Sequence, residues 1–433
     1  MSMGLFFLVF AVLIAVGTPV AVVFGGMASL PSLLDPAFPY TAEAAIRSMV
    51  SGLDSFTLLA VPLFMLSGII MARGKISEKL FNFFAYFIGN RTAGMPCAVI
   101  ITCMFYGAIS GSSPATVSAV GAMTIPFLVA LGYDKIFSTA IVTVAGGLGV
   151  IIPPSISYIV YSSASNASPS DLFIGGVIPG ILIGVALMVC AYIHCKKSGE
   201  DKEKLKENYE KIRSMGLASL FKESFFALLT PVIILGSIYG GIASPTEAAA
   251  ISVIYALLIS LFVYKTLKIR ELPGLLVEGS KTYVTILFII SAATAFGRAL
   301  TMLRYPQVIS AGILGSISSK VMVILVINLI LLVFGMLLDN IPNIMILTPI
   351  FLPIAQSVGM DPVHFGIMMT ANLAIGMVTP PMGINLYVAS SMTGVPVLKI
   401  AKATIPFLIA FFIALMFIAF VPQVSLLLPG LTK

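Results

Sequence analysis

The chain alternates between long apolar stretches and short polar breaks over nearly its whole length. Many apolar stretches run for about 18 residues or more without a charged side chain, which is the length that a helix needs to cross the hydrocarbon core of a bilayer. The one long polar segment is 196–222, where basic and acidic residues are mixed. This pattern predicts an all-α polytopic membrane protein with a solvated linker near the middle of the chain.

The pattern repeats along the chain with an offset of 227 residues. Residues of several types, prolines and glycines above all, become identical pairs when the sequence is shifted by that offset, which is the signature of an internal repeat. The identical pairs are Pro126 and Pro353, Gly132 and Gly359, Asp134 and Asp361, Thr143 and Thr370, Gly149 and Gly376, Pro153 and Pro380, Pro154 and Pro381, and Ser163 and Ser390. We therefore expect two related halves, 1–195 and 223–433, joined by the linker 196–222.

Each half follows the same order of segments. The first half is predicted to contain two apolar segments (3–16 and 19–34), a more polar amphipathic stretch, a span (56–72), a short amphipathic segment (77–90) and a long apolar stretch with a polar tip (93–130). In the second half the two apolar segments are 224–242 and 247–265, a more polar amphipathic stretch follows again, and the later segments are 282–300, 305–318 and 321–357. Two further spans close each half, and the first of these carries a double proline.

The stretches 93–130 and 321–357 each consist of two apolar arms around a polar tip. Each arm has about 16 residues, or about 24 Å as a helix, which is short for a hydrocarbon core about 30 Å thick. We interpret both stretches as re-entrant helical hairpins, so that each half makes five crossings and the second half is inverted relative to the first. If 3–16 and 19–34 form one tilted span, the halves remain inverted and only the N-terminus changes side.

The basic residues indicate the orientation of this arrangement. One side receives all of the 24 Lys and Arg residues except Arg47, Arg298, Arg304, Lys320 and Lys433. Because cytoplasmic loops carry an excess of Lys and Arg, this side is predicted to be cytoplasmic. The first hairpin then opens from the cytoplasm and the second from the opposite side.

The amino-acid composition also indicates a membrane protein. Hydrophobic residues make up 59% of the chain and charged residues only 9%, which is outside the range of soluble proteins. The net charge of +7 suits a protein that faces anionic lipid. The four cysteines form no CxxC pair and are assigned no chemistry.

The double prolines raise the question of why a membrane helix is broken at its middle. Irregular backbone at membrane depth is tolerated only where it is buried in protein or lines a watery cavity. Inverted repeats with discontinuous helices are typical of secondary transporters, in which freed carbonyls bind Na⁺ and helix N-termini favour an anionic substrate. Each half supplies two such elements, a hairpin tip and a double-proline break.

The polar residues of these four elements are small, hydroxylated or amide-bearing. The first tip and its break contain Ser110, Gly111, Ser112, Ser113 and Thr116, and the segment 149–155. The second tip and its break contain Gly335, Asp339, Asn340 and Asn343, and Gly376, Thr379, Pro380, Pro381, Gly383 and Asn385. For any single serine, helix packing is the more common role. Asp339 differs, because a carboxylate at the centre of a membrane helix costs on the order of 2.5–3.5 kcal/mol.

At these residues the sequence resembles a known family, the large membrane subunit of tripartite ATP-independent periplasmic (TRAP) transporters. The resemblance covers essentially the whole chain and rests on five motifs in order: YGAISGSSPAT, GGLGVIIPPS, GGIASPTEAAA, the LD pair before the second tip, and NLAIGMVTPPMGINLYV. It implies a protein of the bacterial cytoplasmic (inner) membrane that takes up C4-dicarboxylates, sialic acids or keto acids by an elevator mechanism. It also implies coupling to Na⁺, with two or more ions, and two partners, a periplasmic substrate-binding protein and a small four-helix membrane subunit.

The resemblance also implies the roles of particular residues. One Na⁺ is expected at Ser110, Ser112, Gly149, Ile152 and Pro154, and a second at Gly335, Asp339, Gly376, Thr379 and Met382, several of them through backbone carbonyls. The substrate is expected between the two tips, and its candidate contacts are Ser113, Thr116, Asn340, Asn343, Asn385 and Arg298. Arg298 stands where the family is expected to carry a neutral aromatic residue, and snorkelling toward the membrane surface is its alternative role.

Two other functions remain open at this point. The first is a stand-alone Na⁺- or H⁺-coupled carrier of carboxylates or other anions that needs no binding protein. The second is an intramembrane enzyme, which the sequence disfavours because the residues before Ser110 do not form a G-x-S-G motif and because the chain has no H-E-x-x-H motif and no Walker A loop. We therefore expect no enzymatic activity.

Overall fold

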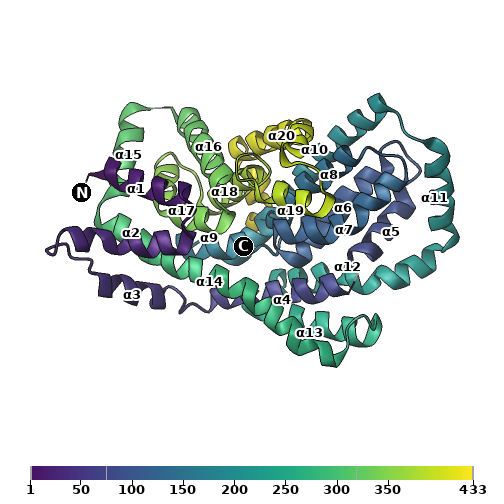
Figure 1. Ribbon diagram of the computed structural model, residues 1–433, viewed down its shortest axis with the longest axis horizontal. Coiled ribbons are helices and arrows are strands. Elements are labelled where there is room, and N and C mark those ends of the chain that lie inside the picture. The colour runs from purple at the N-terminus through teal and green to yellow at the C-terminus, as the bar shows by residue number, and fades with distance from the viewer. Residues whose placement is uncertain (1, 75, 318, 432–433) are drawn as a thin grey trace.

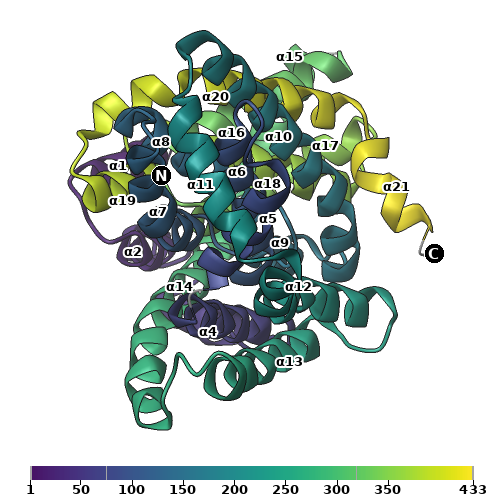
Figure 2. The same ribbon diagram turned by 90° about the vertical axis from the view of Figure 1, so that its right-hand side faces the viewer.

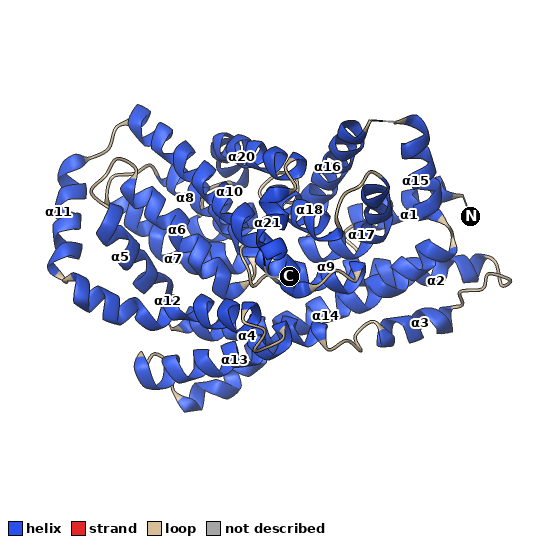
Figure 3. Cartoon of the chain, turned by 180° about the vertical axis from the view of Figure 1, so that it is seen from behind, coloured by secondary structure: helices blue, strands red, loops and turns tan. Residues whose placement is uncertain are grey.

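The computed structural model describes residues 2–74, 76–317 and 319–431, and every regular element within these ranges is a helix (Figures 1 and 3). Seven of the described helices, or up to eight if a bent pair counts as one span, are long and apolar enough to cross a membrane. The all-helical prediction therefore holds for the described ranges. Lys75 and Lys433, which contributed to the predicted orientation, lie outside them.

One layer of the molecule, here called the scaffold layer, runs along the lower side of Figure 1. It consists of α2 (Val20–Leu34), α3 (Ala42–Ser51), α4 (Ala60–Arg73), α12 (Leu217–Tyr239), α13 (Pro245–Leu258) and α14 (Leu272–Met302). Helix α14 packs against α2, α3 and α4, and α13 packs against α4 and α12. The layer thus combines helices from both halves of the chain around α14.

The predicted hairpins form the heart of the rest of the molecule. The first consists of α6 (Gly94–Ser110) and α7 (Ser113–Ala130), and the second of α16 (Lys320–Leu337) and α17 (Asn340–Ser357). Each arm has 17 or 18 residues, or about 26 Å of helix, which is less than the thickness of the hydrocarbon core. Helices α7 and α17 begin and end 227 residues apart, as the sequence offset predicts.

Both double prolines interrupt a helix, as predicted. In the first half α8 (Lys135–Ala145) continues as a 3₁₀ turn over Gly146–Val150, and the chain resumes as α9 (Ile156–Ser165). In the second half α18 (Pro362–Gly376) ends before the prolines and α19 (Ile384–Thr393) follows them. The 153–154 and 380–381 peptide bonds are both cis.

The broken helices are the most deeply buried part of the fold. All residues from Phe137 to Ala145 in α8 and from His364 to Gly376 in α18 are buried. A helix that is covered on all sides must lie at the centre of a bundle. Helices α10 (Pro169–Ser198) and α20 (Val397–Phe420) pack around α8 and α18 and close each half. We call α6 to α10 together with α16 to α20 the hairpin body.

The remaining helices connect or flank these two parts. They are α1 (Met3–Ala15), α5 (Ile76–Ile88), the linker helix α11 (Lys202–Ser214), α15 (Tyr305–Ser316) and α21 (Gln423–Leu431), the last of which extends to one side in Figure 2. Helix α11 joins the hairpin body to the scaffold layer along the edge of the molecule in Figure 1.

The second half differs from its predicted segments at one place. A separate amphipathic stretch was expected before the span 282–300, but α14 is one continuous helix of 31 residues, about 46 Å long. The polar residues Glu278 and Lys281 lie on exposed positions of this helix and do not interrupt it. Polar residues on an exposed helix face interrupt the apolar pattern without ending the helix.

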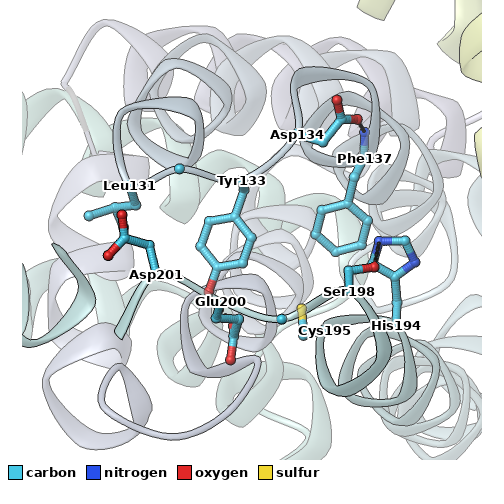
Figure 4. A pocket seen from close by; sticks show the side chains of 11 residues that line it. Leu131, Tyr133, Asp134, Phe137, His194, Cys195, Ser198, Glu200 and Asp201 are labelled. Atoms are coloured by element: carbon cyan, nitrogen blue, oxygen red, sulfur yellow. Dashed lines mark hydrogen bonds between the residues drawn. The ribbon is translucent and has the colours of Figure 1, made fainter. Parts of the chain in front are cut away.

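The linker is fixed to the base of the first hairpin by Glu200. Its carboxylate accepts hydrogen bonds from the hydroxyl of Tyr133 at 2.5 Å and from the backbone N–H of Ala93 at 3.1 Å, so it joins the two open ends of that hairpin. Figure 4 shows Tyr133 directed at Glu200, with Phe137 and His194 stacked beside them. Burial and the adjacent Glu200 carboxylate raise the pKa of Tyr133, which keeps its hydroxyl protonated as a donor.

Candidate functional site

The first break touches the tip of the first hairpin. A Cβ atom at Gly149 would lie 2.5 Å from Oγ1 of Thr116 and 2.7 Å from the carbonyl oxygen of Ser112, closer than real Cβ contacts. Gly111 adopts a φ of +60°, and a Cβ atom there would lie 3.0 Å from the carbonyl oxygen of Pro154. Glycine is therefore required at both positions for the backbone of the break to reach the tip.

Hydroxyl and carbonyl oxygens gather at this contact. The Thr116 hydroxyl donates to the carbonyl oxygen of Ser112 at 2.8 Å and lies 3.0 Å from the Ser110 hydroxyl. Ser110 and Thr116 are buried. The structure thus brings Ser110, Ser112, Gly149 and Pro154 together around oxygen atoms, the ligand type that Na⁺ and other hard cations take. The side chain of Ile152 packs instead against Gly180 of α10.

The second break touches the second tip in the same way. A Cβ atom at Gly376 would lie 2.4 Å from the carbonyl carbon of Gly335, and the N–H of Met382 donates to the carbonyl oxygen of Met336 at 3.0 Å. The Thr379 hydroxyl donates to the carbonyl oxygen of Ile375 at 2.8 Å. The predicted second Na⁺ residues are therefore close together in the fold.

Asp339 begins α17 at the centre of this second tip. Its carboxylate accepts a hydrogen bond from the N–H of Asn340 at 2.7 Å and caps the helix. Together with Gly335 and Met382 it lines a cavity of about 290 Å³, which the loop between α1 and α2 closes on the other side. This leaves the carboxylate one oxygen beyond its capping bond to offer to a cation.

A larger cavity of about 530 Å³, here called the tip cavity, lies between the two tips. Ser110, Ser112, Asp339 and Asn340 line it from the hairpin body. Its other wall belongs to α4 and α14 of the scaffold layer, where Gly68 allows the backbone of Ser110 to approach closely. Both hairpin tips therefore face one space, as predicted for a substrate site.

The tips are held by two hydrogen bonds that cross between the halves. Asn385 of α19 donates to the hydroxyl of Ser113 at 2.7 Å, and Asn340 donates to the hydroxyl of Ser157 in α9 at 3.4 Å. Ser113 and Asn340 are equivalent in the repeat, whereas Asn385 is equivalent to Tyr158, the residue after Ser157, so the two bonds have similar places but not equivalent partners. Each half thus supports the hairpin tip of the other.

The predicted substrate residues occupy different places. Asn340 lines the tip cavity, whereas Ser113, Thr116 and Asn385 are buried behind it and bonded to one another or to backbone. Asn343 is also buried and donates to carbonyl oxygens of Phe334 and Leu338, which ties the second hairpin together. Their proposed contact with substrate stays a prediction.

Arg298 is not brought together with the tips. It lines a separate cavity of about 670 Å³, between the far end of α14 and the loop that joins α9 to α10. Its Nη1 donates to the hydroxyl of Ser48 at 3.3 Å.

The sequence did not single out several residues that line the tip cavity. These are Gly68, Tyr106, Ser118, Ser157, Glu278 and Thr282. Ser157 follows the first double proline by three residues, so its closeness to the break was a usable signal. Tyr106 and Ser118 lie on the arms of the first hairpin itself. Gly68, Glu278 and Thr282 come from α4 and α14, whose approach to the tips depends on the packing of the scaffold layer.

With this geometry in place, comparison with known families identifies the chain. Residues 7–424 match the family model described as the DctM component of the tripartite ATP-independent periplasmic transporter. The chain belongs to this family. TRAP large permeases are multi-pass proteins of the bacterial inner membrane, and the seven or more apolar spans agree with that location.

Two named relatives are TRAP permeases. The chain is 40% identical to the C4-dicarboxylate TRAP transporter large permease protein DctM of Pseudomonas aeruginosa, over 87% of each protein. It is also 40% identical to the isethionate TRAP transporter permease protein DctMQ of Oleidesulfovibrio alaskensis, over 97% of this chain and 65% of that protein. Both relatives are transporter permeases, so the sequence and its relatives agree on a transporter.

A solved transporter structure shows the same fold. MtrF of Neisseria gonorrhoeae, described within a class of antimetabolite efflux pumps, superposes with a TM-score of 0.63 at 15% identity and covers 93% of this chain and 94% of its own. The predicted fold class of inverted repeats with re-entrant hairpins and discontinuous helices is confirmed.

Proposed function

We propose that this TRAP permease takes up a small organic anion of the carboxylate class together with Na⁺, and that a periplasmic binding protein delivers the anion. The family name supports a three-part transporter, and the named relatives support an anionic substrate, a C4-dicarboxylate in one case and isethionate in the other. A small four-helix membrane subunit is the third component of the proposal.

The proposal that Na⁺ binds rests on one observation, which is that in both halves the double-proline break contacts the hairpin tip. In both halves a glycine pair or cluster lets the broken helix touch its hairpin, at Gly149 and at Gly376, and oxygen atoms surround the contact. The two Na⁺ ions are cargo that binds at these contacts with the substrate between them. Na⁺ at the second contact would let Asp339 stay ionised in a dehydrated place.

The arrangement of the two layers supports an elevator movement. The tips and both proposed Na⁺ sites belong to the hairpin body, whereas α4 and α14 form the opposite wall of the tip cavity. The tip cavity extends to Glu278, which pairs with Arg73 at 2.6 Å. Since this end is the predicted cytoplasmic side, the proposed state is inward-facing. The hairpin body would carry the tips along α4 and α14 to face outward.

The proposal is tested by reconstituting the chain in proteoliposomes with and without its partners. We expect no uptake of succinate, isethionate or N-acetylneuraminate by the chain alone, and uptake of one class when the small subunit and loaded binding protein are added. A thermal-shift screen of the binding protein selects the anion to use. Concentrative uptake by the chain alone would instead favour the stand-alone carrier.

A further inference from the structure

The cavity around Arg298 is distinct from the tip cavity and has a polar wall. We call it the Arg298 cavity, and its volume is about 670 Å³. Arg298 is the one charged residue among the described residues that line it. The other polar lining comes mainly from hydroxyl groups, including those of Ser55, Thr57, Ser163, Ser168, Thr294 and Thr301. Ser163, Thr294 and Thr301 already donate to backbone carbonyl oxygens of their own helices. The cavity therefore offers an anion a fixed positive charge, the guanidinium N–H groups and the remaining hydroxyls, and no carboxylate lines it among the described residues.

Arg298 has donors to spare. A guanidinium group carries five N–H donors, and Arg298 uses one of them in its hydrogen bond to Ser48. The ion pairs formed between described residues include none with Arg298. Arg73, near the opposite end of the scaffold layer, is by contrast paired with Glu278. The Arg298 side chain is also exposed, so a solute in the cavity can reach it.

Helix α14 connects this cavity to the tip cavity along one face. Glu278, Thr282 and Ile286 line the tip cavity, and Ala293, Gly297 and Thr301 line the Arg298 cavity. Steps of four residues place the members of each group near one side of the helix, and the step of seven between the groups continues that side. Arg298 follows Gly297 and is turned by about 100° from it, so it lies beside this face. Glu278 and Arg298 are 20 residues apart, or about 30 Å along the helix. The two cavities therefore lie at opposite ends of one membrane-spanning surface.

We propose that the Arg298 cavity is a second anion-binding site, on the side of the membrane opposite to the linker, where a small carboxylate or sulfonate is held before it reaches the tips. The planar guanidinium matches the paired oxygens of such anions, and the hydroxyls of Ser55, Thr57 and Ser168 complete their hydrogen bonds. This inference rests on the proposed function for the direction of travel. The binding of anions in the cavity does not depend on it.

A purely structural role for Arg298 is the competing explanation. The bond to Ser48 joins α14 to α3, and this bond alone would account for an arginine at the position. Ser48→Ala removes the bond but keeps the charge, so it separates the two roles. Arg47→Gln is the matched charge control, because Arg47 lies on the same helix as Ser48 and pairs with Glu43 outside the cavity.

The test uses Thr301→Cys in the reconstituted complex with the small subunit. The rate of labelling by anionic 2-sulfonatoethyl methanethiosulfonate is divided by the rate for its cationic trimethylammonium analogue, after subtraction of labelling of the four native cysteines. We expect Arg298→Gln to lower this ratio about tenfold, the scale of one lost charged hydrogen bond. Arg298→Lys should lower it less, whereas Ser48→Ala and Arg47→Gln should leave it unchanged. Succinate or isethionate should slow the anionic reagent only when Arg298 is present.

An unchanged ratio in both Arg298 variants, or an equal loss in Ser48→Ala, would overturn the proposal. Uptake provides the second measurement. Arg298→Gln should raise the half-saturating concentration of loaded binding protein about tenfold, with Arg298→Lys between it and the parent. If the unsubstituted complex transports none of the anions, the proposed function fails, while the labelling ratio still decides whether the cavity binds anions.

Discussion

Asp339 stands at the start of α17, where its carboxylate caps the helix and lines both cavities beside the second tip. Capping alone does not require a charge, because Asn caps a helix about as well as Asp. A charged group at membrane depth is costly, and a bound cation offsets that cost. Under the proposed function, a bound Na⁺ would account for an acid rather than an amide at this position.

Asp339→Asn removes the charge of this side chain and keeps its shape. The variant should fold and be inserted normally, because cap and shape are kept. Na⁺-dependent uptake should be lost, or its Na⁺ half-saturation concentration raised about tenfold or more, since a charged ligand contributes well over 1 kcal/mol. Uptake measured against Na⁺ concentration in proteoliposomes checks this.

Ser112→Ala is the matched comparison, because Ser112 occupies the equivalent position of the first tip. It removes a neutral hydroxyl and keeps the backbone carbonyl, so we expect a milder shift of the Na⁺ curve. An unchanged Na⁺ curve in Asp339→Asn would mean that the carboxylate is structural and that the second Na⁺ site is wrong.

Among the elements, the hairpins were predictable because their signals are local. The polar tips at Ser110–Ser113 and at Asp339–Asn343 interrupt apolar arms of fixed length, and the double prolines mark the breaks directly. The continuity of α14 was not predictable in this way, because Glu278 and Lys281 interrupt its apolar pattern although the helix continues through them. A polar residue on an exposed helix face and a polar residue at a helix end look alike in one sequence.

The contacts between the two halves could not be predicted from the sequence for a different reason. The offset of 227 residues relates positions that are equivalent, and equivalent positions are not the ones that touch. Ser113 is equivalent to Asn340 but bonds to Asn385, and Asn340 bonds to Ser157. The packing of the scaffold layer likewise determines which cavity Gly68 and Arg298 line.

The cross-half bonds lead to a prediction about stability. Asn385→Ala removes the bonds to the Ser113 hydroxyl and to the Thr143 carbonyl oxygen, and should destabilise the fold by about 1–3 kcal/mol because buried groups lose their partners. Ser113→Ala should cost less, about 1 kcal/mol. Thermal unfolding of the purified complex measures both.

The double variant shows whether the two residues act as a pair. If they do, the combined loss should be smaller than the sum of the single losses by about 0.5 kcal/mol or more. Strictly additive losses would indicate that Asn385 is needed only for its bond to Thr143.

At the scale of the whole molecule, inversion of the two halves can be tested at equivalent positions. Thr92 and Ser319 are 227 residues apart, and both are exposed at the base of a hairpin. Because the hairpins are predicted to open on opposite sides, a membrane-impermeant thiol reagent should label Ser319→Cys in intact cells. Thr92→Cys should be labelled only after permeabilisation. Labelling of both positions from outside would contradict the inverted arrangement.

The whole-molecule account also requires that the Na⁺ gradient supplies the energy for uptake. Each Na⁺ that moves inward at 100 mV contributes about 2.3 kcal/mol from the potential alone, so two ions can support a steep anion gradient. Without the Na⁺ gradient, the loaded binding protein should still bind to the membrane complex, but the anion should no longer accumulate.

The most direct measurement is therefore accumulation of the anion in proteoliposomes that contain this chain and its small subunit, with the loaded binding protein outside. With an inward Na⁺ gradient, the internal concentration should rise well above the external concentration. With equal Na⁺ on both sides and no membrane potential, or with K⁺ in place of Na⁺, the internal concentration of the anion should not exceed the external concentration. Accumulation to the same level without a Na⁺ gradient would contradict the account.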